Sequence, residues 1–318
     1  MAKLLIIGQI PPPIGGVTEH VRRLMQNLRR TGFPSDFCDP GKASLASILF
    51  KIATHRTIHI HFSNPGTQAL FAAFCRLTFK KLIITYHGRW GRYGALGNWA
   101  VKLSAYLAHV PIVQERASLL QALNCNARAR QISTYIPDAD ILPLPARLQA
   151  AIASRRNDYQ ATFCTNAWNV TFDKNGQETY GISEMIARFA DYPEYQLLVS
   201  DPSGNYRLYI EKHAWHIPNN LLFISQLHDF KSILLLSDAF IRNTTTDGGS
   251  LSIHEARELG IPVLASAAVE RPPFCSVFQD FSKADLKEKL EEARRLITLP
   301  GTTYDAVGEL IKLYQEIA

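Results

Sequence analysis

Two carboxylates, Asp247 and Glu255, stand eight positions apart around a polar loop and the start of a predicted helix. The residues between them that open this helix are Gly248, Gly249, Ser250 and Leu251. Free N–H groups at a helix N-terminus attract anions such as a diphosphate. One carboxylate beside such a site is suited to sugar hydroxyls and the other to a ribose. In the alternative interpretation, Asp247 caps the helix and Glu255 is solvated.

A glycine-bearing turn follows the first predicted strand. Gly15 and Gly16 have no Cβ atom, so the backbone there can approach a ligand closely, and a helix N-terminus follows. A plain turn is the alternative. The run QIPPPIGGV lacks the G-x-G-x-x-G spacing, and no acidic residue closes a second strand. Both observations argue against a nicotinamide-dependent oxidoreductase.

A histidine and a set of basic residues in the first half complete the candidates. His87 directly follows the predicted strand 82–86 and precedes Gly88, a position suited to hydroxyl or leaving-group contacts, although a structural histidine is the alternative. Residues 1–150 carry a net charge of +12 and the remainder −6. The basic residues expected at an acceptor or an anionic membrane surface are Arg76, Lys80, Lys81, Arg89 and Arg92. Nucleic acid is not expected, because no zinc-finger or RNA-binding motif is present.

The elements that must position these residues alternate between short apolar strands and amphipathic helices. Strands are predicted at 3–8, 58–62, 82–86, 110–114, 131–135, 161–166, 195–200, 221–225, 239–241 and 262–266. Helices are predicted at 17–30, 67–79, 96–109, 117–123, 182–190, 207–215, 231–236, 251–259, 283–298 and 304–317. This alternation predicts an α/β fold with parallel sheets.

A proline-containing segment interrupts the alternation and is predicted to be a linker at 141–160. It separates a Rossmann-like acceptor domain at 1–140 from a Rossmann-like donor domain at 161–300, and a last helix at 301–318 closes the chain. Two such domains facing each other across a cleft are expected, with ligands at the carboxyl ends of the strands.

The cysteines and the apolar runs indicate the cellular compartment of the protein. Five cysteines form no C-x-x-C pair, which argues against a disulfide framework or a structural zinc and favours a reducing compartment. The N-terminus is predicted to be a first strand rather than a signal peptide, and no apolar stretch approaches the length of a membrane span. A cytoplasmic chain, soluble or peripheral, is expected.

The run from Asp238 to Ala256, with its LGIPV tail, resembles the acidic-x7-acidic signature of the family 4 glycosyltransferases, which have the GT-B fold. The usual first acid is Glu, and Asp247 stands in its place. Weaker matches to the same family are Gly15-Gly16-Val17 with His20, Thr85-Tyr86-His87-Gly88, Tyr180-Gly181 before a helix, and the C-terminal helix with Tyr314.

The resemblance implies a role for each matched residue. Glu255 binds the ribose of the donor nucleotide, while Asp247 and the N–H groups of 248–251 hold the donor sugar and the diphosphate. Gly16, with Gly15 beside it, lets the first domain's backbone touch the diphosphate. His87 lies near the transferred sugar.

One departure from the family concerns the leaving group. The family usually carries an Arg and a Lys that neutralise the departing diphosphate, and this chain has neither base at the corresponding positions. Lys174 and Arg242 are the candidates to replace them, although a solvated loop lysine is the alternative for Lys174. Without such charges, stabilisation of the leaving group weakens.

The function implied by the resemblance is a retaining transferase that needs no metal and no other cofactor. It moves a sugar from a UDP- or GDP-sugar to a glycan acceptor by front-face attack. The acceptor is expected to be polyprenyl-diphosphate-linked, as in bacterial lipopolysaccharide O-antigen or capsule polysaccharide biosynthesis, at the inner face of the plasma membrane. A non-catalytic nucleotide-sugar-binding partner subunit and a nucleotide-sugar epimerase of the same fold are the alternatives.

Overall fold

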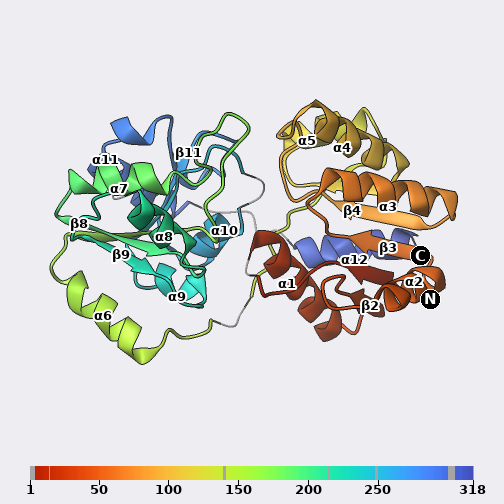
Figure 1. Ribbon diagram of the computed structural model, residues 1–318, viewed down its shortest axis with the longest axis horizontal. Helices are drawn as coiled ribbons and strands as arrows, with labels where there is room; N and C mark the ends of the chain where they lie inside the picture. Colours follow the sequence, from red (N-terminus) through yellow and green to blue (C-terminus); the bar gives the residue numbers. More distant parts are fainter. Residues whose placement is uncertain are drawn as a thin grey trace. The chain divides into compact units, whose positions relative to one another are not determined.

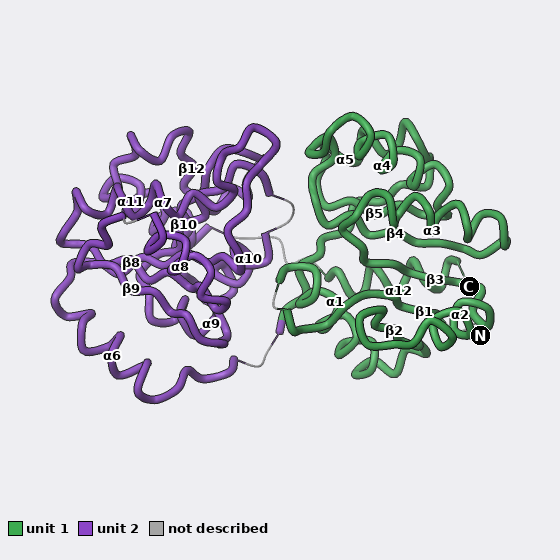
Figure 2. Tube along the Cα trace, in the orientation of Figure 1, with its two compact units in different colours: residues 1–137, 303–318 green, residues 138–302 purple. Residues whose placement is uncertain are grey.

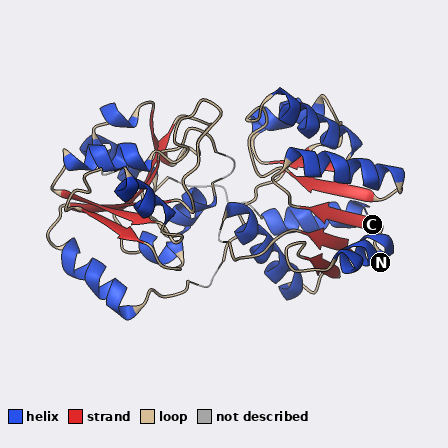
Figure 3. Ribbon diagram, in the orientation of Figure 1, coloured by secondary structure: helices blue, strands red, loops and turns tan. Residues whose placement is uncertain are grey.

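The computed structural model describes residues 4–13, 15–138, 141–213, 215–247, 250–299 and 305–317. The chain forms two compact units (Figure 2). Unit 1 consists of residues 1–137 and 303–318, and unit 2 consists of residues 138–302. Each unit has its own parallel sheet with helices around it (Figure 3).

Unit 1 contains a six-stranded parallel sheet in the order β2-β1-β3-β4-β5-β6. Its strands are β1 (Leu4–Ile7), β2 (Ser35–Cys38), β3 (Thr57–Ile60), β4 (Lys81–Thr85), β5 (Val110–Val113) and β6 (Arg130–Gln131). Alternate residues of β1 enter different apolar clusters, because successive side chains point to opposite faces of a sheet. Both faces are therefore covered, which explains the unbroken apolar run of this strand.

The helices of unit 1 are α1 (Gly16–Arg30), α2 (Leu45–Thr54), α3 (Pro65–Leu77), α4 (Ala95–Leu107), α5 (Arg116–Leu123) and α12 (Ala306–Ile317). The last of these, α12, packs with β1 and α1 although it ends the chain (Figure 1). Its Tyr314 hydroxyl lies 2.7 Å from Nδ1 of His59 in β3. The predicted return of the C-terminal helix to the first domain is confirmed.

Unit 2 contains a second six-stranded parallel sheet, in the order β12-β11-β10-β7-β8-β9. Its strands are β7 (Ala161–Asn166), β8 (Tyr195–Ser200), β9 (Leu221–Ile224), β10 (Ala239–Arg242), β11 (Val263–Ser266) and β12 (Cys275–Phe278). Its helices are α6 (Ala146–Arg156), α7 (Ile182–Ala190), α8 (Asn205–Lys212), α9 (Phe230–Leu234), α10 (Leu251–Glu258) and α11 (Leu286–Leu296), with a 3-10 turn at Phe281–Lys283. The predicted α/β class is confirmed.

Four elements were not predicted from the sequence. β2 and β12 are four-residue strands at sheet edges, too short for a clear alternating pattern. α2 exposes Leu45, Leu49 and Phe50, so its apolar residues do not mark one buried face. The segment predicted to be a linker contains α6, which buries Ile152 in unit 2. None of the described helices is both long and apolar enough to cross a bilayer.

The strand orders place a topological switch point in each unit. In unit 1 it lies between β1 and β3, and in unit 2 between β7 and β10, because the order of the strands reverses there. Ligands of open α/β sheets bind beyond the carboxyl ends of the strands at such points. His61 follows the end of β3, and Arg242 ends β10.

Candidate functional site

In unit 2, Asp247 lies between two arginines beyond the carboxyl ends of β10 and β11. The Nε atom of Arg242 lies 3.0 Å from Oδ2 of Asp247, and its Nη2 atom lies 3.2 Å from Oδ1. The Nη1 atom of Arg271 lies 2.9 Å from the same Oδ2. Only 7% of the Asp247 side chain and 2% of the Arg271 side chain are exposed. Two guanidinium groups against one carboxylate give this arginine–aspartate cluster a net charge of +1.

The surroundings hold the cluster in place. Arg271 donates from Nε to the carbonyl oxygen of Ser266 over 2.8 Å and from Nη2 to the hydroxyl of Thr244 over 3.0 Å. Burial raises the pKa of Asp247, but the charges and hydrogen bonds of Arg242 and Arg271 outweigh it, and the pKa lies below its usual value. Asp247 is therefore ionised at neutral pH, and both of its carboxylate oxygens accept hydrogen bonds from arginines.

The N-terminus of α10 is the second part of this site. Ser250 precedes the helix with extended backbone, and its side chain makes no capping hydrogen bond. Its Oγ atom is buried without a partner among the described residues. Ser252, in the first turn, accepts a hydrogen bond of 2.9 Å from the amide of Asn166 at the end of β7. A helix N-terminus beside a cluster of charge +1 is suited to a diphosphate.

The remaining residues predicted around this helix have different positions. Leu251 is the first residue of α10, and Glu255 is buried one turn further along it. Gly248 and Gly249 lie outside the described residues.

Of the two cations predicted to neutralise the leaving group, Arg242 belongs to the cluster. Its guanidinium lies 5.1 Å from the ring centre of Tyr180, and its Nη1 atom lies 3.4 Å from Oδ1 of Asn166. Lys174 is exposed in a loop closed by a β-bridge between Phe172 and Glu178. The loop therefore presents Lys174 to solvent, whereas the second cation of the cluster, Arg271, comes from a different segment.

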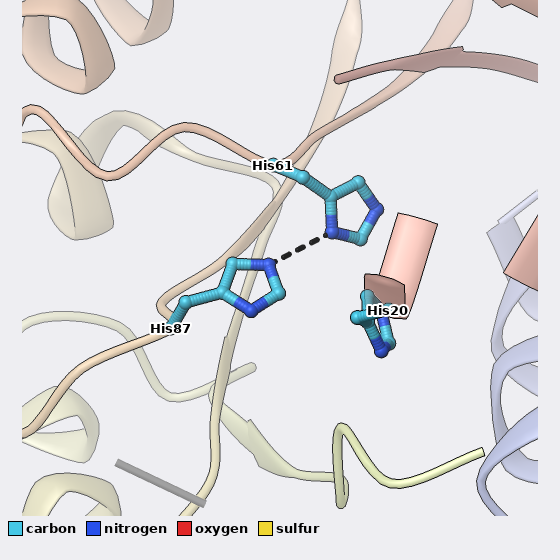
Figure 4. A group of neighbouring side chains, drawn as sticks. All are labelled: His20, His61 and His87. Atoms are coloured by element: carbon cyan, nitrogen blue, oxygen red, sulfur yellow. Dashed lines mark hydrogen bonds between the residues drawn. The ribbon is translucent and has the colours of Figure 1, made fainter. Parts of the chain in front are cut away.

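In unit 1, four histidines gather where β3 and β4 end beside α1. His59 lies in β3, His61 follows β3, His87 follows β4 and His20 lies on α1. The ring centres of His20, His61 and His87 lie 5.1, 5.1 and 5.3 Å apart (Figure 4). We call these three residues the histidine triangle.

Hydrogen bonds fix part of the tautomer pattern. His20 Nδ1 lies 2.7 Å from the carbonyl oxygen of Thr134, so this nitrogen carries the proton and Nε2 keeps its lone pair. His61 Nδ1 lies 3.1 Å from His87 Nε2. Both nitrogens of His59 are engaged, one by Tyr314 and the other by Thr85 over 2.8 Å. His20 Nε2 and His61 Nε2 are buried without a partner among the described residues.

The cluster is uncharged at neutral pH. Burial lowers the pKa of His20 to about 4 and that of His59 to about 3. Burial and the neighbouring imidazoles hold the pKa values of His61 and His87 well below the usual value. Neutral imidazoles offer lone pairs to hydroxyl protons or to a metal ion. Among the described residues, the histidine triangle has ligand atoms close enough for an ion, within 4.8 Å of one another.

A small hollow lies beside His87. Its walls include Gln68, Arg89, Trp90 and Arg92. Gln68 Oε1 and Trp90 Nε1 are buried polar atoms that have no partner among the described residues. Both atoms are closed off from solvent, so the polar groups that this hollow presents are mainly those of its two arginines.

The predicted basic surface is only partly available to a ligand. Arg76 is exposed on α3. The ammonium group of Lys80 instead donates to the carbonyl oxygen of His55 over 2.9 Å, and that of Lys81 donates to the carbonyl oxygen of Ile317 at the end of α12. Lys80 and Lys81 therefore tie segments of unit 1 together.

The glycines of the first turn have room beside them. A Cβ atom built at Gly16 meets nothing within 4 Å, and one at Gly15 meets only the Thr18 hydroxyl at 3.9 Å. Gly15 has an extended backbone that any residue adopts. Internal packing therefore does not require glycine at either position, and contact with a ligand stays the prediction for both.

Three residues of these sites were not predicted from the sequence. His59 and His61 stand two positions apart at the end of a strand, a spacing that places both on one face and was the available signal. Arg271 follows β11 by five residues and precedes two prolines, with no spacing that pairs it with Asp247.

No protein-family model and no curated protein sequence matches the chain. Its fold is nevertheless similar to those of solved glycosyltransferase structures. HepE of Anabaena, in complex with UDP and glucose, is 13% identical and superimposes with a TM-score of 0.73 over 100% of both chains. The sucrose-phosphate synthase of Thermosynechococcus elongatus gives 0.72 at 14% identity over 99% of both chains.

A third solved structure, WaaG, is described as a glycosyltransferase involved in lipopolysaccharide biosynthesis. It is 10% identical, with a TM-score of 0.62 over 98% of this chain and 99% of its own. At these identities the likeness concerns the fold, which is the GT-B fold of these neighbours.

Proposed function

We propose that the protein is a retaining glycosyltransferase of family 4 that uses a nucleotide-sugar donor. The observation that carries the proposal is the arginine–aspartate cluster, with its net positive charge, beside the N-terminus of α10 at the switch point of unit 2. This is a site for a diphosphate. Neighbours of the same fold, such as HepE, bind UDP and UDP-glucose, which supports a nucleotide sugar as the ligand.

In this proposal Arg242 and Arg271 take the place of the family's diphosphate-neutralising Arg and Lys. The departing diphosphate gains negative charge as its bond to the sugar breaks, and fixed positive groups stabilise that charge without reorganising. Asp247 positions both guanidiniums. Glu255, buried on α10, binds the ribose of the nucleotide.

The reaction follows a front-face course. The bond from the anomeric carbon to the diphosphate oxygen breaks, and the acceptor oxygen forms its new bond on the same face of the sugar. The acceptor proton passes to the departing phosphate oxygen, so the configuration is retained and no protein base is required. His87 contacts the transferred sugar. The helix N-terminus and the arginines provide the positive field on the diphosphate, and no metal ion is placed there.

A donor panel tests this function. The protein is expected to be stabilised against thermal unfolding by one nucleotide sugar among UDP-, GDP- and TDP-sugars, with EDTA present, and to release its nucleotide slowly. Turnover with a lipid-linked glycan acceptor, and an α-anomer product from an α-donor, would complete the case. Stabilisation without any turnover would favour a non-catalytic nucleotide-sugar-binding subunit, and epimerised donor would favour an epimerase. No response to any nucleotide sugar contradicts all three.

Glu255→Ala is expected to weaken binding of the donor by about 10- to 100-fold, because a hydrogen bond from a ribose hydroxyl to a carboxylate contributes about 1.5–3 kcal/mol. Isothermal titration with the bare nucleotide measures the effect without chemistry. Glu258→Ala, an exposed glutamate on the same helix, is the matched control and should bind normally. Equal losses in the two variants would remove Glu255 from the ribose site.

The acceptor is proposed to be a polyprenyl-diphosphate-linked glycan, reached at the inner face of the plasma membrane, in lipopolysaccharide or capsule biosynthesis. Two neighbouring helices of unit 1, α3 and α4, support a membrane-facing surface. The side chains of Leu77 and Trp99 are 78% and 62% exposed. Phe79 is 90% exposed and has a left-handed backbone with φ of 56°, which is unfavourable for a bulky residue. Exposed apolar side chains beside Arg76 are typical of an interfacial surface.

Cosedimentation with vesicles tests the membrane step. The protein is expected to bind vesicles that contain phosphatidylglycerol, and to bind them more weakly at high salt. It should not bind vesicles of pure phosphatidylcholine. The triple variant L77S/F79S/W99S should lower binding by at least about tenfold, since each side chain loses apolar area that the membrane would bury. Leu208→Ser, which changes a 63% exposed leucine on α8 of unit 2, should bind normally. Salt-insensitive binding, or none, contradicts the proposal.

A further inference from the structure

The rings of the histidine triangle have the separation that a tetrahedral metal ion requires. Zinc–nitrogen bonds are about 2.0–2.1 Å long, and the ring centre lies roughly 1.1 Å beyond the nitrogen, so two imidazoles on one tetrahedral ion have centres about 5.2 Å apart. The three observed separations are 5.1, 5.1 and 5.3 Å.

The distances between the ring nitrogens are also compatible with a tetrahedral ion. His61 Nδ1 and His87 Nε2 share a hydrogen bond of 3.1 Å, which binding of an ion would replace; the distance is close to the separation of about 3.3 Å between two nitrogens on a tetrahedral zinc. The ligand atoms of all three histidines lie within 4.8 Å of one another, so binding requires the third nitrogen to move closer to the other two. His59, the fourth histidine of the cluster, is not a ligand because Tyr314 and Thr85 engage both of its nitrogens.

The hydrogen bonding of His20 leaves one of its ring nitrogens available to bind an ion. His20 donates from Nδ1 to the carbonyl oxygen of Thr134, the arrangement by which metal-binding histidines are usually oriented. Its Nε2 lone pair is buried without a partner among the described residues. Buried polar atoms are rarely left unpaired, and an ion would engage the lone pair of His20.

We propose that His20, His61 and His87 form a binding site for one divalent transition-metal ion, with zinc as the best fit. Three imidazoles and one open position suit a tetrahedral ion with nitrogen ligands. Each imidazole stays neutral, with its proton on the nitrogen that does not face the ion. The site lies in unit 1, whereas Arg242 and Arg271, proposed to stabilise the donor diphosphate, lie in unit 2.

An ion in the triangle takes a nitrogen of His87. This consequence rests on the proposed function: zinc removes His87 from the donor sugar and inhibits transfer, whereas EDTA leaves transfer intact. Zinc binding without inhibition would support the metal site and contradict the role of His87 in transfer.

Metal binding to the full-length protein tests the site directly. After treatment with a chelator and removal of the chelator, equilibrium dialysis is expected to show about one zinc ion per chain. His87→Ala and His61→Asn should each weaken that binding by at least about tenfold, since even residues that only orient a ligand contribute this much. His109→Ala and Cys125→Ser, which change a histidine and a cysteine of unit 1 outside the triangle, should bind as the unchanged protein does.

Cobalt provides a readout that needs no variant, in case the buried substitutions impair folding. Cobalt bound by three imidazoles should give the visible absorption of a four-coordinate ion without the near-ultraviolet thiolate band that cysteine ligation produces. Zinc should displace it at one equivalent. A thiolate band, zinc binding lost in Cys125→Ser, or affinity unchanged in folded His87→Ala would overturn the proposal.

Discussion

Replacing Asp247 with Asn is expected to lower the free energy of unfolding of unit 2 by about 3–5 kcal/mol. Removing the partner of a buried ion pair leaves uncompensated charge, which is strongly destabilising. Here the loss leaves two guanidiniums, 12% and 2% exposed, facing an uncharged amide. Urea unfolding followed by a probe in unit 2, such as Trp215 fluorescence, measures the change, because the two units need not unfold together.

Two further variants distinguish the charge effect from other causes. Asp158→Asn, an exposed aspartate of unit 2, should change stability by less than about 0.5 kcal/mol. In the double variant D247N/R271M, one buried positive charge is gone, so part of the lost stability should return. A loss below about 1 kcal/mol in D247N, or no recovery in the double variant, would contradict the electrostatic account.

The effect of Asp247 should also depend on pH. The pKa of Asp247 is lowered in the folded protein, so its contribution to stability is fully present above the unfolded-state pKa of about 3.9. That contribution is lost as the pH falls through the folded-state pKa. The stability difference between wild type and D247N should therefore be constant near neutrality and shrink below about pH 4.

Replacing Arg242 with Gln is expected to reduce kcat by about 100- to 1000-fold, the usual effect of removing one preorganised group that stabilises charge in a transition state. Arg242 is the more exposed arginine of the cluster and ends β10 at the switch point of unit 2. Without it, Asp247 and Arg271 form a neutral pair, so the cluster loses its net positive charge. Single-turnover kinetics with saturating donor measures the chemical step itself.

Controls separate this effect from a loss of folding. Arg207→Gln removes an exposed arginine of unit 2 that pairs with Glu211, and its kcat should stay within about twofold of wild type. Arg242→Lys keeps the charge but loses the two-point contact with Asp247, so it should recover part of the rate. If R242Q is folded, binds donor and turns over normally, the diphosphate is stabilised elsewhere.

The sequence determined the fold class and the position of helix α10. Unbroken apolar strands such as β1 and β9, separated by amphipathic helices, favour a parallel sheet covered on both faces, and both sheets are parallel. The acidic spacing around 247–255 located the loop and helix that form one side of the unit 2 site. These features are local, because hydrophobic periodicity and helix starts depend on residues that are close together in the sequence.

The partners within each site were decided only by the tertiary structure. Arg271 reaches Asp247 because β10 and β11 are neighbours whose carboxyl ends lie at one edge of the sheet. His20, His61 and His87 meet because the order β1-β3-β4 brings α1 and two strand ends together. Strand order follows from the packing of whole elements, and no short-range pattern encodes it. The sequence thus specified which segments end at the functional edge of each sheet, and the tertiary fold determined which side chains pair there.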